Sequence, residues 1–511
     1  MKGFLSKKRQ SKLTAWVVGG LLCASASSAA NLVAVEAASP DFTAPLLGTE
    51  GDQAYIDAGV RQADGTYLFT KDSWIAWRNA RGENPGAIRL LADLKIDAGD
   101  HVLKVTSGAK AADVKEAAAI VNDDGKNVEI KAKALKLTVN DTTSAAPLER
   151  AWGIRSAGGA VEISGPIEID VSGTKESKAI EVSGGTMFMD DLKIKTNVAA
   201  ADSAALLARN DASIDAIVKE IDGHVVAKDA DSQISLQFAD GPGYIKGYIY
   251  GDGNISLSMQ DDSSWYHENP GGVLPAGFTG SHLNVYQGDS KSKIFQRDDR
   301  PITINQILSK NLNVVYEHDA AVPQRIKGGD IVINHGFGVD VTLLTDSAGL
   351  NTSPSASRAE KNLVSATLSA LAGKLRYTDY DPKVDAITGN VQISEGLTNP
   401  SVRLEHITFD AATGRGKYLY TPLIEPPSEQ TQTDFTTSIT GKEAHDAPYA
   451  NAGIRKADGS YVFTKDTTIT SGKNLIMAGA WMNAISAAVS NADAGKTLDI
   501  DLNGRKLAIK T

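Results

Sequence analysis

The residues of this sequence most obviously suited to chemistry are adjacent pairs of carboxylates. Among them are Asp190-Asp191, Asp261-Asp262 and Asp298-Asp299. Carboxylates grouped on one face of a fold act as general acids and bases or hold calcium. Adjacent strand residues point to opposite faces, so each pair offers one outward carboxylate unless it lies in a turn. We expect Asp261-Asp262 to lie in a solvated loop that extends to His267, and not in a catalytic centre.

The sequence contains no recognisable metal or cofactor motif. Its eight histidines lack the His-x-x-x-His spacing of a metal site. The stretch Gly251-Asp252-Gly253-Asn254 faintly resembles a calcium-binding nonapeptide repeat, but it occurs once and such sites need tandem copies. The sequence therefore predicts no catalytic residues, no cofactor and no metal, and a protein that is not an enzyme.

The elements that would position these residues repeat between Trp152 and Trp265. The pair Gly158-Gly159 recurs as Gly184-Gly185, and each pair is followed by two short alternating strands. A third pass begins at Asn210-Asp211, residue types that tolerate a left-handed turn almost as well as glycine. Short strands, turns with positive φ and a period near 26 predict an all-β fold, a right-handed parallel β-helix.

The periodicity changes after residue 350. Apolar residues then follow a 4-3-4 spacing that defines one face of an amphipathic helix, at Val364, Leu368, Leu371 and Leu375. Ser357 and Glu360 have the spacing of a capping box. We therefore expect one helix over residues 357–376, inserted into the β-helix.

A longer repeat relates the beginning of the chain to its end. The stretch YIDAGVRQADGTYLFTKD begins at Tyr55 and returns at Tyr449 as YANAGIRKADGSYVFTKD, identical at 12 of 18 positions. Ala63-Asp64-Gly65 and Ala457-Asp458-Gly459 are typical of hairpin turns. Because the first copy opens a long module, we expect the second to open another, and the chain to be a fragment or an interrupted reading frame.

Residues 1–30 have the features of a secretory signal peptide. Five basic residues and no acid precede an apolar run of about ten residues, well short of the roughly 20 that span a bilayer. The single cysteine, Cys23, lies in this segment, so the exported chain would form no disulfide. Removing five positive charges from a chain at −10 leaves about −15, which argues against nucleic-acid binding.

Three stretches within 205–265 read ALLARNDASIDAI, EIDGHVVAKDADSQISLQF and YIKGYIYGDGNISLSMQDDSSW. They resemble the passenger regions of bacterial autotransporters, which use type V secretion and have a pectin-lyase-like β-helix. The later SATLSALAGKLRYT and VQISEGLTNPS, with the restarted YANAGIRKADGSYVFTKDTTI, resemble modules of large surface proteins of didermic Firmicutes.

The resemblance implies an exported protein at the cell surface, the outer membrane or outside a Gram-negative-type bacterium. It implies a β-helical stalk for adhesion to host or bacterial surface ligands, and a C-terminal outer-membrane β-barrel as partner, which these 511 residues do not contain. Two alternatives remain open: a polysaccharide lyase or hydrolase on the same fold, and a purely structural spacer. An enzyme would gather Asp, Arg or Lys beside a groove on one face, whereas a scaffold would have a charged exterior without such convergence.

Some autotransporter passengers are serine proteases with a Gly-Asp-Ser-Gly signature. Here Gly288-Asp289-Ser290 is followed by Lys291. No two-barrel protease domain is evident before it. We therefore expect Ser290 to be a loop serine without a catalytic role.

The predicted domain organisation follows from these boundaries. It comprises a signal peptide at 1–30, an N-terminal cap or disordered segment at 31–51, a β-helix passenger module at 52–350, a helix with the terminal strands of that module at 351–423, a linker at 424–443, and the start of a second, truncated β-helix module at 444–511.

Overall fold

The computed structural model describes residues 54–55, 59–79, 86–90, 92–140, 144–197, 202–239, 241–319, 321–336, 338–378, 387–394, 401–410, 412–420, 422–423, 453–455, 461–463, 467–470, 500–501, 504 and 507–510. The predicted signal peptide, N-terminal cap and linker lie outside these residues. The chain divides into two compact units. The first comprises Met1–Asp319, Arg325–Asp346 and Ala370–Tyr418, and the second comprises Ala320–Gln324, Ser347–Ser369 and Leu419–Thr511. The predicted domain boundaries stay predictions.

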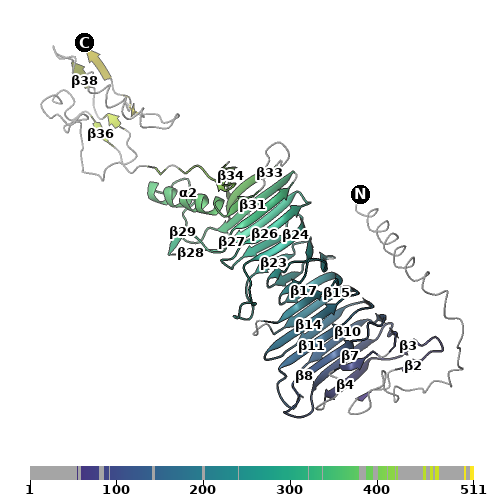
Figure 1. Cartoon of the computed structure of the whole chain (residues 1–511). Helices are drawn as coiled ribbons and strands as arrows, with labels where there is room; N and C mark the ends of the chain where they lie inside the picture. The colour runs from purple at the N-terminus through teal and green to yellow at the C-terminus, as the bar shows by residue number, and fades with distance from the viewer. Residues whose placement is uncertain are drawn as a thin grey trace. The chain divides into compact units, whose positions relative to one another are not determined.

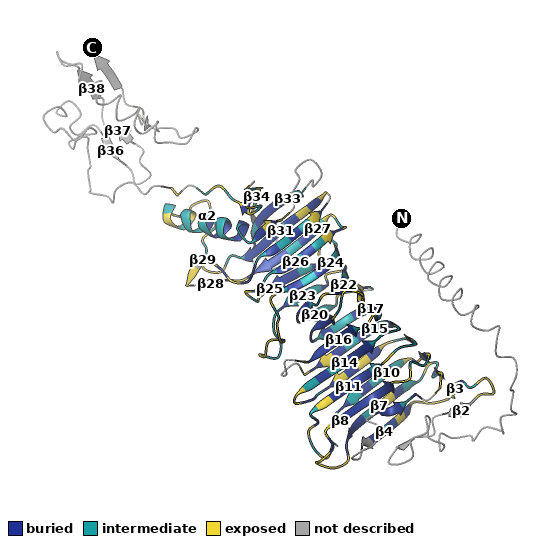
Figure 2. Cartoon of the chain, in the orientation of Figure 1, coloured by how far each residue is buried: buried dark blue, intermediate teal, exposed yellow. Residues whose placement is uncertain are grey.

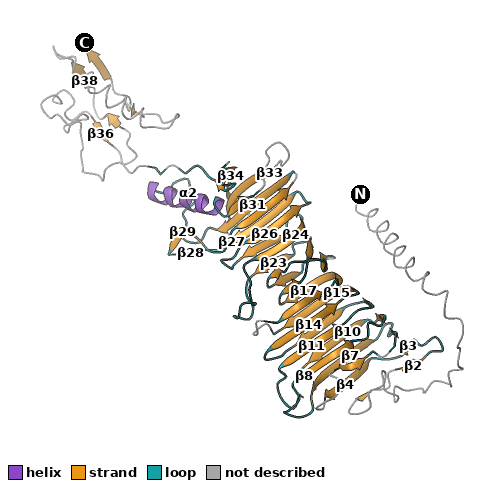
Figure 3. Cartoon of the chain, viewed as in Figure 1, coloured by secondary structure: helices purple, strands orange, loops and turns teal. Residues whose placement is uncertain are grey.

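The described residues are almost entirely strands and turns, with one helix, α2 (Arg358–Ala372) (Figure 3). Most strands belong to a large, nearly closed and mostly parallel sheet, an arrangement compatible with a β-helix. The predicted all-β class is thereby confirmed. Within the described part of the chain, no helix has the length and apolar character needed to cross a membrane.

In the first unit the chain passes repeatedly through three parallel ladders of strands (Figure 1). The first ladder runs through β4 (Ser73–Asn79), β7 (Val102–Ala109), β10 (Ala134–Val139), β13 (Ile167–Val171), β15 (Thr186–Thr196), β17 (Ser213–Asp222), β20 (Tyr244–Lys246), β23 (Ser264–His267), β25 (Lys293–Gln296), β27 (Asn311–Tyr316), β31 (Val339–Asp346) and β33 (Ile387–Ser394).

The second ladder shares the long strands β15 and β17 with the first. Its other members are β3 (Tyr67–Phe69), β6 (Leu94–Asp97), β9 (Val128–Lys131), β12 (Ala160–Ser164), β19 (Gln233–Phe238), β22 (Asn254–Met259), β24 (Ser281–Gly288), β26 (Ile302–Ile307), β30 (Ile331–Gly336) and β32 (Leu375–Tyr377).

The third ladder is a separate seven-stranded parallel sheet. It consists of β5 (Gly86–Arg89), β8 (Glu116–Asn122), β11 (Arg150–Ser156), β14 (Glu176–Ser183), β16 (Ala204–Arg209), β18 (Val225–Ala227) and β21 (Ile249–Tyr250).

Antiparallel strands occur near the two ends of the first unit. They are β1 (Ala54–Tyr55) beside β4, β2 (Gly59–Arg61) beside β3, β34 (Ser401–Phe409) beside β33, and β35 (Gly416–Lys417) beside β34. Two further short strands are β28 (His318–Asp319) and β29 (Val322–Ile326).

Along many strands of the first two ladders, buried residues alternate with more exposed ones (Figure 2). In β13, Ile167, Ile169 and Val171 are buried while Glu168 and Asp170 are exposed. This is the period of two that a strand imposes, and it makes the interior of the coils the hydrophobic core of the unit. Because a coil pairs only with its neighbours, backbone hydrogen bonding and apolar burial both depend on stacking.

The turns predicted from the paired glycines have left-handed conformations. Gly159 and Gly185 have φ of 74° and 76°, and Asn210 and Asp211 follow with 54° and 64°. A Cβ built on Gly185 would lie 2.2 Å from the carbonyl oxygen of Gly159, so the stacked turns leave no room for a side chain there. Backbone conformation and close approach together require glycine at this turn.

The predicted period near 26 holds for the middle coils and changes elsewhere. Paired residues show the step directly, since Leu135 pairs with Ile167, Val161 with Met187 and Ile234 with Ile255. The offset between partners is thus 32, 26 and 21 in these three pairs, and it rises again to 44 where Ile331 pairs with Leu375. The strands keep their spacing while the loops between them differ in length. The sequence offset between paired strands is therefore set by loop length.

The predicted helix forms, but it is shorter than expected. Its capping box is present, since the Ser357 N–H donates to Glu360 Oε2 at 2.7 Å and the Glu360 N–H donates to Ser357 Oγ at 3.3 Å. The helix ends at Ala372, and Leu375, predicted to continue the apolar face, begins the parallel strand β32.

The described residues of the second unit repeat pairings of the first. The strands are β36 (Gly453–Arg455), β37 (Tyr461–Phe463), β38 (Thr467–Thr470), β39 (Ile500–Asp501) and β40 (Leu507–Lys510). Gly453 pairs antiparallel with Phe463, just as Gly59 pairs with Phe69. β37 then pairs parallel with β39, and β38 with β40, as β3 does with β6 and β4 with β7. The repeated sequence thus produces a repeated structure.

Candidate functional site

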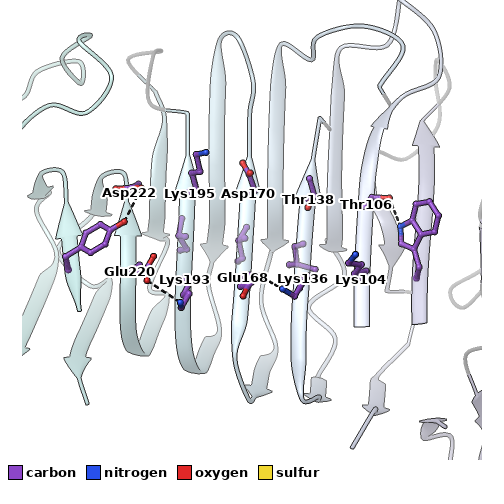
Figure 4. A pocket seen from close by; sticks show the side chains of 15 residues that line it. Lys104, Thr106, Lys136, Thr138, Glu168, Asp170, Lys193, Lys195, Glu220 and Asp222 are labelled. Carbon is purple, nitrogen blue, oxygen red and sulfur yellow. Dashed lines mark hydrogen bonds and ion pairs between the residues drawn. The ribbon is translucent and has the colours of Figure 1, made fainter. Parts of the chain in front are cut away.

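A groove of about 730 Å³ lies on the outward face of the first ladder. It crosses β4, β7, β10, β13, β15, β17 and β20 (Figure 4). The residues that line it are Trp74, Lys104, Thr106, Lys136, Leu137, Thr138, Glu168, Ile169, Asp170, Lys193, Ile194, Lys195, Glu220, Asp222 and Tyr244. We call it the charged groove.

The register of the strands arranges the polar side chains of the charged groove in two rows that run across the strands. The first row is Trp74, Lys104, Lys136, Glu168, Lys193, Glu220 and Tyr244. The second row lies two residues further along each strand and is Thr106, Thr138, Asp170, Lys195 and Asp222. Facing residues in adjacent parallel strands are close neighbours, so each row is a continuous line of side chains.

From Lys136 to Glu220 opposite charges alternate along the first row and form two ion pairs, whereas Lys104 faces Lys136. Lys136 Nζ lies 2.6 Å from Glu168 Oε2, and Lys193 Nζ lies 3.2 Å from Glu220 Oε1. Lys104 and Lys195 have no ion pair with any other residue that the structure describes. These two ammonium groups are therefore available to a ligand.

An aromatic side chain lies at each end of the first row. Trp74 is 38% exposed, and its indole N–H donates to Thr106 Oγ1 at 3.1 Å. At the other end the Tyr244 hydroxyl donates to Asp222 Oδ2 at 3.4 Å. Partial burial, and then the negative charge of Asp222, raise the pKa of Tyr244 to about 12, so this phenol stays a hydrogen-bond donor. Both rings are held by neighbours in the second row.

The carboxylate pairs considered from the sequence lie outside the charged groove. Asp191 has φ of 49° at an irregularity in the pairing of β15 with β17. Burial, reinforced by the charge of Asp191, raises the pKa of the Asp190 carboxyl. Burial also raises the pKa of Asp215, and the charge of Asp190 acts in the same direction. Among the described residues, no group of three His, Cys, Asp or Glu side chains could hold a metal ion.

Asp261 and Asp262 occupy an exposed turn with φ of 57° and 64°. The predicted loop does not extend to His267, because β23 begins at Ser264 and buries both Trp265 and His267 completely. Alternation in a short strand explains the error, since two large inward residues two positions apart are a strand signal that the preceding acidic turn obscured.

Asp298 and Asp299 have structural contacts. The Tyr248 hydroxyl donates to Asp298 Oδ2 at 2.7 Å, and Arg300 forms an ion pair with the same carboxylate at 3.0 Å. These partners lower the pKa of Asp298, although its burial works in the opposite direction. Asp299 Oδ1 accepts from the Gly328 N–H at 3.3 Å.

Ser290 is exposed in a turn, and its carbonyl oxygen accepts from the Asn313 side chain at 3.3 Å. The neighbouring Asp289 accepts from the N–H groups of Lys291 and Ser292, at 3.0 and 2.7 Å. Asp289 therefore stabilises the turn and is not arranged to orient a catalytic base.

A second group of polar residues is buried inside the middle coils. His224 stacks on Tyr248 with ring centroids 5.0 Å apart, and His267 Nδ1 lies 2.5 Å from Gln296 Oε1. Burial lowers the pKa of both imidazoles to about 4. The two histidines are therefore neutral near pH 7, as members of the interior packing.

A smaller cavity of about 390 Å³ lies on the third ladder. At its centre Glu181, only 3% exposed, accepts from the Trp152 indole at 2.8 Å and pairs with Arg209 at 2.8 Å and with Lys178 at 3.4 Å. A buried carboxylate with three such partners is typical of a structural site.

A sequence pattern for the charged groove exists, but a search for adjacent acidic residues does not find it. The segments Lys193-Ile194-Lys195 and Glu220-Ile221-Asp222 place two charged residues around one buried apolar residue, as does Glu168-Ile169-Asp170. One face of a strand displays positions i and i+2. Recurrence of this triplet in successive coils marks a charged face.

Comparisons with protein-family models, with curated proteins and with solved structures found no match. The function is therefore inferred from the sequence and from the geometry of the described residues.

Proposed function

We propose that this protein is an exported, surface-displayed passenger of the autotransporter type, in which a right-handed parallel β-helix acts as a stalk for adhesion or interaction. The charged groove is its binding face. The observation that carries the proposal is the pair of continuous side-chain rows, which gather four lysines and four carboxylates in one groove.

Three further features support the proposal. The composition of residues 1–30 predicts export. Strand-to-strand connections between parallel neighbours are overwhelmingly right-handed, which favours that hand for these coils. From β4 to β33 the first ladder has eleven steps of about 4.8 Å each, a rise of about 50 Å along the ladder, which is a suitable length for a stalk.

A polysaccharide lyase or hydrolase remains the second candidate, and one observation favours it. Glu168 and Glu220 face the same groove with Lys193 between them. Two strand spacings separate their backbones by about 10 Å, close to the upper end of carboxyl separations in inverting glycosidases. Incubation of the protein with neutral and acidic polysaccharides, with reducing ends and unsaturated products measured, decides between binding and turnover.

The proposed stalk is tested with beads that carry the full chain. We expect such beads to adhere to bacterial or host-cell surfaces, and the double variant Lys136→Glu/Lys193→Glu to adhere less, because it leaves each glutamate facing a like charge. The matched control is Lys95→Glu, since Lys95 pairs with Glu129 on the second ladder, outside the groove. Equal adhesion of both variants and the native chain would contradict the groove as the binding face.

Export is tested separately by expressing the chain in a Gram-negative host and sequencing the N-terminus of the product outside the cytoplasm. A product that begins near residue 30 supports the proposal. Retention of the whole chain in the cytoplasm with Met1 intact contradicts it.

A further inference from the structure

We propose that the charged groove binds a neutral polysaccharide, a polyhydroxylated chain that lies along the rows and stacks on Trp74 and Tyr244. The inference rests on the proposed role of the groove as the binding face, and it specifies the class of ligand.

The charges of the groove indicate a ligand without net charge. Its lining contains four ammonium groups and four carboxylates, which alternate in sign from β10 to β17. A polyanion or a polycation would meet repulsion at every second strand, and the balanced lining gives no net field to steer either one.

The same lining suits a ligand rich in hydroxyl groups. A hydroxyl donates one hydrogen bond and accepts others, whereas an ammonium group only donates and a carboxylate only accepts. Along the rows, donors and acceptors alternate at about 4.8 Å, the spacing of strands. Lys104 and Lys195, which lack an ion pair within the described residues, offer donors without breaking an existing pair.

Aromatic rings at both ends of the first row give the groove apolar surfaces. Trp74 is 38% exposed and is fixed by its hydrogen bond to Thr106. Tyr244 is half-buried and is held between the Asp222 carboxylate and the edge of Tyr266, with ring centroids 6.4 Å apart. Rigid aromatic faces next to polar groups match the alternating C–H faces and hydroxyl edges of sugar rings.

The length of the groove suits a chain of several sugars. Trp74 and Tyr244 lie on strands separated by six steps of the ladder, about 29 Å at the usual spacing. The volume of about 730 Å³ lies within the usual range for ligand sites.

An extended peptide is less well suited to this surface. Peptides often bind by adding a strand to a free sheet edge. Here the floor of the groove is a sheet face, and its central strands pair on both sides, as β10 does with β7 and β13. Only side chains are left to bind the ligand.

The test measures binding of the full chain by isothermal titration calorimetry and affinity electrophoresis. The probes are a linear β-glucan oligosaccharide and a mannan as neutral chains, polygalacturonate as a polyanion and polylysine as a polycation. We expect at least one neutral chain to bind, with little change in affinity between low and high salt. Tighter binding of either charged polymer than of both neutral chains would overturn the inference.

The variants locate the binding site. Trp74→Ala and Tyr244→Ala should each weaken binding of the neutral chain roughly tenfold, since each removes one stacking surface, and Tyr244→Phe should retain most of the affinity. Glu162→Gln is the control, because Glu162 is exposed on β12 of the second ladder. Unchanged thermal unfolding verifies that each variant folds. Equal affinity of Trp74→Ala and Glu162→Gln contradicts the inference.

Failure of this inference is distinguishable from failure of the proposed function. If beads with the full chain adhere to cells through the groove but neither neutral chain binds, only the ligand class is wrong. If groove variants alter neither adhesion nor polysaccharide binding, the groove is not the binding face.

Discussion

The lower coils of the first ladder, from β10 to β17, and its upper coils, from β23 to β31, use the same outward row of positions in opposite ways. In the lower coils the row is Thr138, Asp170, Lys195 and Asp222. In the upper coils, joined through Lys246, the row continues as Tyr266, Phe295, Val315 and Leu344.

The upper row is buried although it points away from the coil interior. Phe295, Val315 and Leu344 are 9%, 5% and 9% exposed, and they pack as one cluster with Tyr266. The backbone pairing is the same parallel ladder in both halves. The ladder thus provides the same outward positions in both halves, and different residue types occupy them in the solvated groove and in the packed apolar surface.

The interiors of the two halves differ as well. The lower coils are filled by aliphatic side chains such as Leu137 and Ile169, whereas the upper coils contain Trp265, His267 and Tyr286, all fully buried. The upper half therefore depends on large and polar interior groups, and its stability should be the more sensitive to substitution and to pH.

The largest expected effect is that of Trp265→Ala. The indole is 0% exposed and donates to the Gly247 carbonyl at 2.9 Å, so its removal leaves a cavity and an unsatisfied acceptor. We expect a loss of about 3–5 kcal/mol in the free energy of unfolding, measured by urea denaturation. Ile169→Val in the lower coils is the control, with a loss of about 1 kcal/mol. Equal losses would contradict the difference between the interiors.

Phe295→Ala tests the outer apolar row. The ring stacks on Tyr266 with centroids 4.7 Å apart and is almost buried. We expect a loss of about 2–3 kcal/mol, somewhat less than for a ring within the core. Lys195→Ala, at the corresponding position of the lower row, should change stability by less than about 0.5 kcal/mol. Similar values for the two variants would show that the upper row is not packed.

Acid should destabilise the coils that bury His224 and His267. Burial, the largest cause, lowers the pKa of His224 and His267 from 6.5 to about 4, while Asp298 and Arg300 act on His267 in opposite directions. Between pH 6.5 and 4 the unfolded chain therefore binds more protons, so stability falls as the pH falls through this window, by about 2–3 kcal/mol for each histidine. Urea midpoints measured across this range test the prediction. His267→Gln should flatten the dependence, and an unchanged slope would contradict the assignment.

The smallest expected effect is that of the ion pairs in the charged groove. Lys193 and Glu220 have side chains 45% and 46% exposed, so their pair is well solvated. Lys193→Ala should change the free energy of unfolding by less than about 1 kcal/mol, and the change should diminish further at high salt. A larger effect in thermal unfolding would indicate that the groove stabilises the coils.

The sequence predicts the ladders well where turn chemistry and alternation agree. Paired glycines followed by Val161 and by Met187 identify two coils and their register. The sequence also predicts the capping box of α2, because Ser357 and Glu360 interact locally. The end of the helix is harder to predict from the sequence. Leu375 fits the helical period, yet it belongs to a strand whose partner, Ile331, is far away in the sequence.

The charged groove could not be located by inspecting neighbours in the sequence. Lys136 and Glu168 meet because β10 and β13, in successive coils, pair in register, and the step between coils changes along the chain. These two residues can be placed next to each other only when the pairing register of the strands is already known. Loop lengths decide which charges face one another, and loop lengths are the least regular feature of this sequence.

The hairpin of β2 and β3, followed by coils of parallel strands, indicates how the chain folds. The hairpin joins residues close in sequence. Most later coils close a loop of about 20 to 34 residues onto a completed one, and the last coils, where Ile331 pairs with Leu375, close a longer one. The first unit can therefore grow in one direction, from a local nucleus, with each coil serving as the template for the next. Replacing Gly65, whose φ of 87° forms the hairpin turn, with valine should slow refolding more than it accelerates unfolding. Such sequential growth allows a chain to fold as it emerges from a narrow passage.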